Sequence, residues 1–259
     1  MRKMLRKIVT WLFCAIAVVA SANPLRLSTT HMLIPRTGQE YITVFNTSDA
    51  IAYFRVNVER VVINAQGQPT YVTARNPNEL GLLVSPVNLK MQPRQKRKVR
   101  VLSLVNKVPG LVSGTGHVYY RIDFDHVTQQ DLEQQKKMND PVPDGALQFL
   151  IRGKIAKTVI VDVGSRQDLN PQTSNQFVKV DRPDSKITQQ LEITNTGNVV
   201  VWIVDMEICD ASACQKGGWF RMLYPGEIYR IDVPPTTVKM SYTEKLGKRQ
   251  QRQSVTIPA

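Results

Sequence analysis

The chain has 259 residues and a formal net charge of +13. This length excludes a minimal domain and allows either one large domain or two of ordinary size, each with its own core. The excess of basic residues is compatible with nucleic acids, acidic proteins, carboxylates or anionic membrane surfaces as partners. The N-terminal segment narrows this choice.

Residues 1–22 have the features of a secretory signal peptide. Four basic residues come first, an almost continuously apolar run follows over 8–20, and Ala20-Ser21-Ala22 supplies small residues for cleavage. The apolar run is short for a membrane anchor, which needs about 20 apolar residues, so cleavage is favoured over retention. Four basic residues leave with this segment and no acidic ones, so the charge falls from +13 to +9. We therefore expect an exported, basic protein that does not bind nucleic acid.

Two of the three cysteines remain after cleavage. Cys14 lies in the removed segment, whereas Cys209 and Cys214 are separated by four residues. In an oxidising compartment such a pair predicts a local disulfide that fixes one corner of the fold. A redox or metal site is disfavoured because the spacing is unsuitable and no histidine lies nearby.

The mature chain reads as two β-sandwich domains. Short runs rich in Val, Ile, Tyr and Phe are separated by turn residues, with little helical periodicity. The expected strands are 41–46, 52–62, 82–89, 97–105, 116–125 and 147–162 in the first domain, and 189–194, 199–207, 219–223, 228–233 and 238–243 in the second. The break Gly164-Ser165-Arg166 divides the chain into domains 23–164 and 165–259. The basic segment 245–252 is expected to be a polar tail.

A dense basic cluster precedes and enters one of these strands. Its members are Arg94, Lys96, Arg97, Lys98 and Arg100. Apolar Val99 and Val101 alternate with the later members, which indicates the solvated face of a strand.

The most informative segment is the strand that follows the polar stretch 126–145, which we expect to be mobile. Leu147, Phe149, Ile151 and Ile155 share one face of an extended chain because side chains alternate with a period of two. This face could pack into its own sandwich. However, Leu150 on the other face can provide the buried side, which leaves an exposed edge with bulky side chains. Such an edge is an aggregation hazard unless it is used, and its physical use is β-augmentation of a partner.

Several short motifs follow one another over nearly the whole mature chain. They are 80–86 (LGLLVSP), 91–93 (MQP), 99–101 (VRV), 119–122 (YYRI), 147–154, 194–198 (TNTGN), the cysteine pair and 223–226 (LYPG). In order and spacing they resemble the periplasmic chaperones of chaperone-usher fimbriae, most closely the alternative or α-fimbrial class.

The resemblance implies a boomerang of two immunoglobulin-like domains with the PapD-like fold. It also implies a periplasmic location, major and minor fimbrial subunits and an outer-membrane usher as partners, and no cofactor or metal. The chaperone lends its own strand to a subunit that lacks one, and on this model Leu147, Phe149 and Ile151 are the donated side chains.

In such chaperones a lysine on the donor strand and an arginine on the first strand hold the subunit's C-terminal carboxylate. Lys154 or Lys157 can be the lysine, and we prefer Lys154, which lies opposite Ile155 in the alternation. The place expected for the arginine falls at Thr30 and His31 instead. The nearest arginines are Arg26 and Arg36.

The sequence has to be compared with two other classes of function, an enzyme and a structural surface protein. An enzyme would have to use His31, His117 or His126, but nothing in the sequence groups them and no catalytic motif is present, so no enzymatic activity is expected. An immunoglobulin-like adhesin or fimbrial structural component would itself need a partner's strand, whereas both domains here have a full set. Self-association of the free form through the exposed strand stays open.

Overall fold

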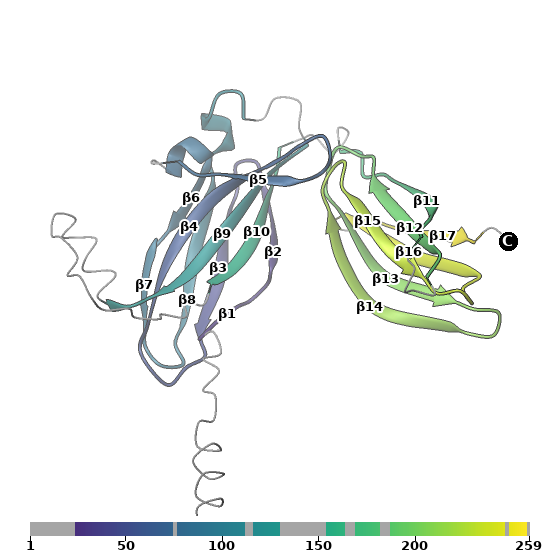
Figure 1. Ribbon diagram of the computed structural model, residues 1–259. Coiled ribbons are helices and arrows are strands. Elements are labelled where there is room, and N and C mark those ends of the chain that lie inside the picture. Colours follow the sequence, from purple (N-terminus) through teal and green to yellow (C-terminus); the bar gives the residue numbers. More distant parts are fainter. Residues whose placement is uncertain are drawn as a thin grey trace, which may run out of the picture.

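The computed structural model describes residues 24–74, 77–111, 116–129, 154–163, 169–181, 187–246 and 249–257. These residues form two β-sandwiches that meet at one end and diverge from there like the arms of a boomerang (Figure 1). The predicted all-β fold with two sandwiches is confirmed. The predicted signal peptide, the row Leu147, Phe149 and Ile151, and the predicted domain break lie outside the described residues.

The first sandwich consists of two sheets. One has the order β1 (Leu25–Leu27), β3 (Gln39–Asn46), β8 (Lys96–Ser103) and β6 (Leu82–Ser85). The other has the order β2 (His31–Pro35), β10 (Lys154–Asp162), β9 (His117–Val127), β4 (Ala52–Ile63) and β5 (Pro69–Val72), and β7 (Asn88–Met91) also pairs with β4. Short 3-10 turns occupy η1 (Pro77–Leu80) and η2 (Val105–Lys107).

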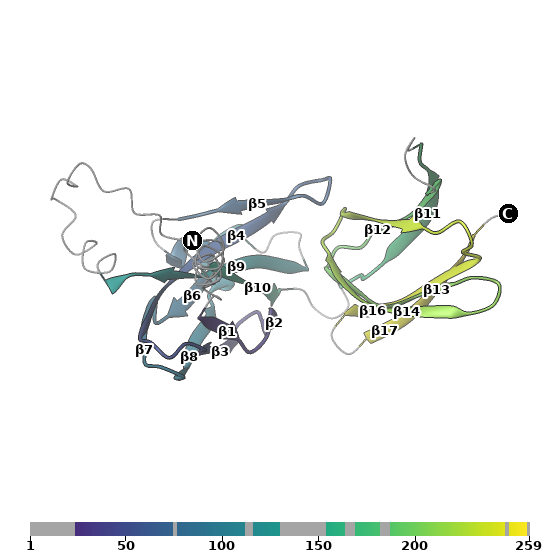
Figure 2. The ribbon, with the colours of Figure 1, turned by 60° about the horizontal axis from the view of Figure 1, so that its bottom comes forward.

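Alternation of side chains builds the core between these two sheets. Val99 and Val101 of β8 face the interior, and Phe54 of β4 and Phe124 of β9 reach it from the opposite layer, all fully buried. The two layers lie one above the other in Figure 2, with β3 and β8 below β4 and β5. Burial of this apolar face is the main favourable term for each sheet, because neither sheet has another partner to cover it.

The second sandwich has a three-stranded and a four-stranded sheet. The first has the order β11 (Thr173–Lys179), β12 (Gln189–Asn195) and β15 (Ile228–Val233), and the second has the order β14 (Cys214–Leu223), β13 (Val201–Cys209), β16 (Lys239–Leu246) and β17 (Arg249–Thr256). In β13 the register shifts around Asp205, which has a positive φ of 52°, as in a β-bulge. Leu191, Ile203 and Tyr242 are fully buried between the two sheets.

Several predicted strands need correction. The expected strand 82–89 is two strands, β6 and β7, that lie in different sheets, and the chain turns between them at Ser85-Pro86. The expected polar tail 245–252 contains the first half of strand β17, which pairs with β16 over its whole length. The side chains of β17 are almost all polar and exposed, so the sequence has no apolar alternation that would predict a strand there. The strand is defined by its main-chain pairing with β16.

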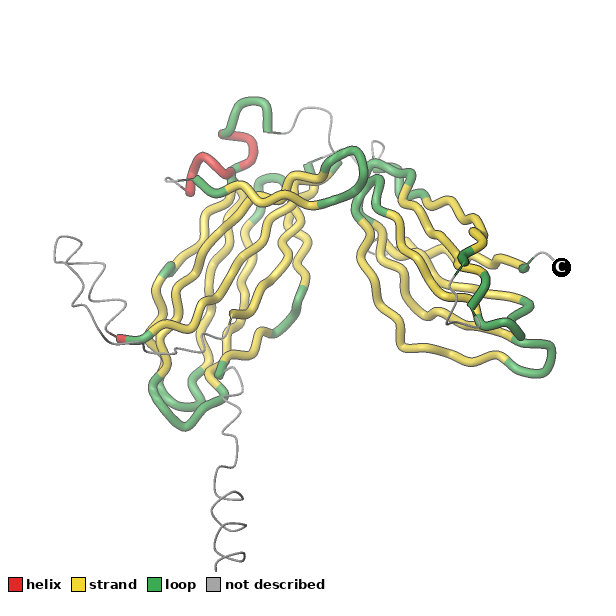
Figure 3. The backbone as a smooth tube through the Cα atoms, in the orientation of Figure 1, coloured by secondary structure: helices red, strands yellow, loops and turns green. Residues whose placement is uncertain are grey.

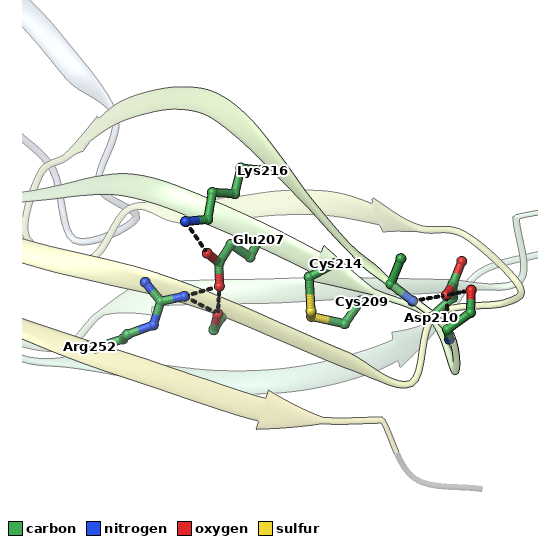
Figure 4. The surroundings of a disulfide bond; sticks show 9 residues. Glu207, Cys209, Asp210, Cys214, Lys216 and Arg252 are labelled. Atoms are coloured by element: carbon green, nitrogen blue, oxygen red, sulfur yellow. Dashed lines mark hydrogen bonds and ion pairs between the residues drawn. A yellow bond between two sulfur atoms is a disulfide. The ribbon is translucent and has the colours of Figure 1, made fainter.

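The predicted disulfide is confirmed between Cys209 and Cys214, which end β13 and begin β14. The turn between them is closed by Asp210, whose carboxylate accepts hydrogen bonds from the backbone N–H groups of Ser212 and Ala213, both at 2.8 Å (Figure 4). The disulfide therefore fixes a corner that already has its own hydrogen bonds.

The two sandwiches meet through apolar side chains at the ends of their strands. Val61, Tyr119 and Ile160 of the first sandwich form one buried cluster with Val200 of the second. The Tyr119 ring also lies edge-on to that of Tyr224, with centroids 5.0 Å apart. In the tube of Figure 3 the loop between β4 and β5 reaches the second sandwich at this elbow.

Gly67 in that loop has φ of 73°, and a Cβ there would lie 2.1 Å from the backbone nitrogen of Glu227. The close approach of the two backbones therefore requires glycine. None of the described residues forms a helix long and apolar enough to cross a bilayer.

Asn195 at the end of β12 offers a test of the second sandwich. Its buried side-chain amide donates to the carbonyls of Val199 and Leu223 at 2.8 and 2.9 Å, and its side-chain oxygen accepts from the N–H of Gly197. Asn195→Ala leaves those carbonyls buried without donors, so we expect a loss of about 2–4 kcal/mol in the free energy of unfolding, measured with urea. Gln251→Ala on exposed β17 should change it by no more than about 0.5 kcal/mol. Equal midpoints for the two variants would contradict this assignment.

Candidate functional site

Strand β10 has a partner on both edges over only part of its length. It pairs antiparallel with β9 from Lys154 to Asp162, but its parallel pairing with β2 covers only Thr158 to Asp162. Among the described residues, no strand pairs with the second edge of β10 between Lys154 and Lys157. An edge therefore opens at Lys157 and runs toward the preceding segment, which contains the predicted donor row.

Side chains of β10 alternate between the interior of the first sandwich and its outer face. Val159 and Val161 are fully buried in the core, and Ile155 packs against it. Lys157 has the same parity and is 0 % exposed, whereas Lys154 is exposed on the other face. The two candidate lysines therefore lie on opposite faces of the sheet.

Lys157 is a buried cation on the interior side. Its ammonium group donates to the carbonyl oxygen of Thr29 at 2.8 Å and also to the Thr29 hydroxyl. No carboxylate forms an ion pair with it among the described residues. Burial of the charge lowers the pKa of Lys157 to about 8. The positive charge is thus held by neutral oxygen atoms, without an acidic partner in the described ranges.

Lys154 is neutralised on the outer face. Its ammonium group lies 2.7 Å from a carboxylate oxygen of Asp123 and 3.9 Å from one of Asp125. Asp123 is fully buried and also pairs with the guanidinium of Arg121 at 2.8 Å. The hydrogen bond to Asp123 raises the pKa of Lys154. Lys154 therefore already serves to balance a buried carboxylate.

The structure brings Lys157 together with the first-strand segment that the sequence singled out. Thr158 pairs with His31, and the pKa of His31 is lowered by burial and by the nearby charge of Lys157. Arg26 is exposed on β1 and Arg36 bonds to Asn106, so neither contacts Lys157. Thr29 is a site residue that sequence reasoning missed, because a threonine that bonds through its backbone carbonyl leaves no distinctive signal in the sequence.

The three histidines do not converge. His117 and His126 lie at opposite ends of β9, and His31 lies on β2. His117 is 3 % exposed, and burial lowers its pKa to about 4. It lines an open pocket of about 530 Å³ to which both sandwiches contribute residues. No group of three His, Cys, Asp or Glu side chains able to hold a metal occurs within the described residues.

The chain was compared with known protein families, curated sequences and solved structures, and only solved structures are similar to it. No protein-family model and no curated protein sequence matches the chain. Solved structures with the same fold do exist. The YadV chaperone aligns with a TM-score of 0.55 and 6% identity over 90% of this chain and 100% of its own.

Two further solved structures are similar. A chain of the CsuC–CsuE chaperone-tip adhesion subunit pre-assembly complex, from the archaic chaperone-usher Csu pili of Acinetobacter baumannii, aligns with a TM-score of 0.53 and 13% identity, over 89% of this chain and 97% of its own. The class 5 fimbriae chaperone CfaA aligns with a TM-score of 0.50 and 15% identity, over 91% of this chain and 100% of its own. The chain thus has the two-sandwich fold of the fimbrial chaperones.

The buried charge of Lys157 can be tested through stability. Below pH 8 Lys157 is protonated in both the folded and the unfolded state, so folding bears the full cost of burying the charge. As the pH rises from about 8 to 10.5 the folded protein releases this proton first, and the cost disappears. Lys157→Met, which keeps the length of the side chain, should therefore stabilise the protein at pH 7 by on the order of 2 kcal/mol, and the gain should vanish near pH 10.5.

Lys154→Met is the matched control for this measurement by thermal unfolding. It removes a cation from buried Asp123, so it should destabilise the protein at pH 7. A Lys157→Met protein that is less stable than the wild type at pH 7, with a difference that does not depend on pH, would contradict the buried-charge assignment.

Proposed function

We propose that the protein is a periplasmic chaperone that binds fimbrial subunits, stabilises them by lending a β-strand, and delivers them to an outer-membrane usher. The observation that carries this proposal is the edge of β10, which loses its β2 partner at Lys157. The fold supports it, because solved structures with this fold are chaperones and some of them are complexes with a pilin or a tip subunit.

The donated strand is the upstream continuation of β10. In an extended chain Leu147, Phe149 and Ile151 have the parity of Ile155 and Lys157, which face the interior side of the sheet. A subunit that lacks a strand would complete its own sandwich with this row. Main-chain hydrogen bonds along the open edge would supply affinity, and the apolar side chains would fill pockets of the subunit.

The subunit's C-terminal carboxylate binds Lys157 in this proposal, rather than Lys154, which the sequence argument preferred. Lys154 already has Asp123 and Asp125 as partners, so a further carboxylate there would face two negative charges. Lys157 has a buried positive charge that bonds to Thr29 and has no carboxylate partner within the described part of the chain, so the subunit's carboxylate would supply a counter-ion. Thr29 and His31 take the place of the arginine that other chaperones use.

The donor row gives the first functional prediction. Phe149→Asp places a charge where an apolar side chain would enter the subunit, so the variant should fold but fail to capture a co-expressed fimbrial subunit. The control is Gln148→Asp, which adds the same charge at a position of the opposite parity. Capture is measured as the amount of subunit that co-purifies. Normal capture of the subunit by a folded Phe149→Asp variant would contradict the strand-donation proposal.

The two lysines of β10 give the second functional prediction. Lys157→Met should weaken subunit binding about 10-fold to 100-fold, because a charge-assisted bond to the carboxylate is lost, while Lys154→Met should change it much less. Binding is measured by competition between each variant and the wild type for a limiting amount of subunit. If Lys154→Met has the larger effect, the carboxylate is held on the outer face and the assignment to Lys157 is wrong.

The proposal as a whole is tested by size-exclusion chromatography of periplasmic extracts, with and without a co-expressed fimbrial subunit from the same source. A one-to-one complex that protects the subunit from degradation is expected. A protein that elutes alone while the subunit is degraded would instead favour an adhesin or another binding role for the same fold.

A further inference from the structure

The outer face of the β1-β3-β8-β6 sheet is unusually basic. Outward positions alternate with the buried ones, so Lys96, Lys98 and Arg100 of β8 point away from a core that holds Val99 and Val101. The predicted solvated face of this strand is thus observed. Arg26 extends the outward cations to β1, and Tyr41 and Phe45 of β3 lie between. We call these six residues the basic face: Arg26, Tyr41, Phe45, Lys96, Lys98 and Arg100.

The register places the members of the basic face side by side. Phe45 is directly opposite Arg26 on one side and Lys96 on the other, and Tyr41 is opposite Arg100. The ammonium group of Lys96 lies 5.7 Å from the centre of the Phe45 ring, and that of Lys98 lies 5.8 Å from the centre of the Tyr41 ring. Strand spacing and rise put the four cations within about 10 by 14 Å. They form one surface, not isolated side chains.

No acidic side chain balances this charge. None of the four cations forms an ion pair with any residue that the structure describes. Glu40 on β3 has the parity of buried Ile42, and Asp49 pairs with Arg94 in a turn at 2.8 Å. Like charges at neighbouring positions on a sheet repel one another, so the arrangement has a cost to folding. An anionic partner would offset that cost.

The basic face lies on a different sheet from the strand that the proposed function uses. Strand β10 with Lys157, and Tyr119 and Ile160 at the elbow, belong to the other sheet of the first sandwich. In Figure 2 β1, β3 and β8 form the lower layer of that sandwich, on the side opposite β4 and β5. A partner bound to the basic face would therefore leave the elbow and the outer face of the second sheet uncovered.

We propose that the basic face docks the protein on a bilayer that contains anionic phospholipids. A cluster of four or more Lys and Arg residues is typical of binding to anionic lipid surfaces, and Tyr and Phe side chains suit the interface between headgroups and acyl chains. Tyr41 is 47 % exposed and available for that role. An acidic peptide would be expected to add to a strand edge or fill a groove, whereas this face offers side-chain cations spread over the middle of a sheet. The inference goes beyond subunit binding and does not depend on it.

The test is flotation of the mature protein with phosphatidylcholine vesicles that contain or lack phosphatidylglycerol. We expect binding only to the anionic vesicles, and weaker binding as salt is raised. The triple variant K96Q/K98Q/R100Q should bind about 100-fold more weakly, since each basic residue near an anionic surface contributes a factor of about five. The control K179Q/K239Q/K245Q removes three exposed lysines from the second sandwich, and so the same net charge, and should bind nearly as well as the wild type.

Four outcomes would overturn the proposal. Equal losses in the two triple variants would mean that net charge alone attracts the protein. Absence of binding to anionic vesicles by the wild type would exclude docking, and release of bound protein by millimolar glycerol phosphate would indicate a site for a single phosphate. Stronger binding of the basic face to polyglutamate than to the vesicles would assign it to an acidic protein instead. Thermal unfolding of each variant checks that it is folded.

Discussion

The parallel pairing of β2 with the second half of β10 is the constraint on which the candidate site depends. Where β2 is present, from Thr158 onward, β10 is an interior strand of its sheet and its side chains complete the core and the elbow. Before Thr158 no strand among the described residues pairs with this edge of β10, and the proposed binding role begins there. One strand thus serves two purposes, and the division lies at Lys157.

Lys154 and Lys157, which lie next to the point where the pairing of β10 with β2 ends, have different electrostatic environments. Lys154 compensates a carboxylate that the sheet has already buried, and the two groups stabilise each other on the outer face. Lys157 is fully buried and donates to oxygen atoms of Thr29, and no carboxylate of the described residues forms an ion pair with it, which is unfavourable for an ammonium ion. In the proposed function the subunit's carboxylate would supply a negative charge at this place.

Much of the fold could be predicted from the sequence because apolar alternation reports burial directly. Strands such as β4, β13 and β15 were placed to within two residues, since each of them has one face in a core. Strand β17 and the short β5 were missed, because their side chains are mostly exposed and only main-chain bonds define them. For the site, parity put the two lysines on opposite faces and led to a preference for Lys154. Parity could not reveal their partners, because Asp123 on one face and Thr29 on the other are distant in sequence.

The elbow between the sandwiches has a consequence for the size of what the molecule can hold. Val61, Ile160 and Val200 are buried there, and Gly67 lets the β4–β5 loop touch the backbone of the second sandwich. Apolar burial at the elbow opposes free rotation of one sandwich against the other, so it restricts the range of distances between them. If the proposed function is correct, a subunit bound between the sandwiches would have to fit this range of distances. A domain that is too broad would then be excluded sterically, whatever its sequence.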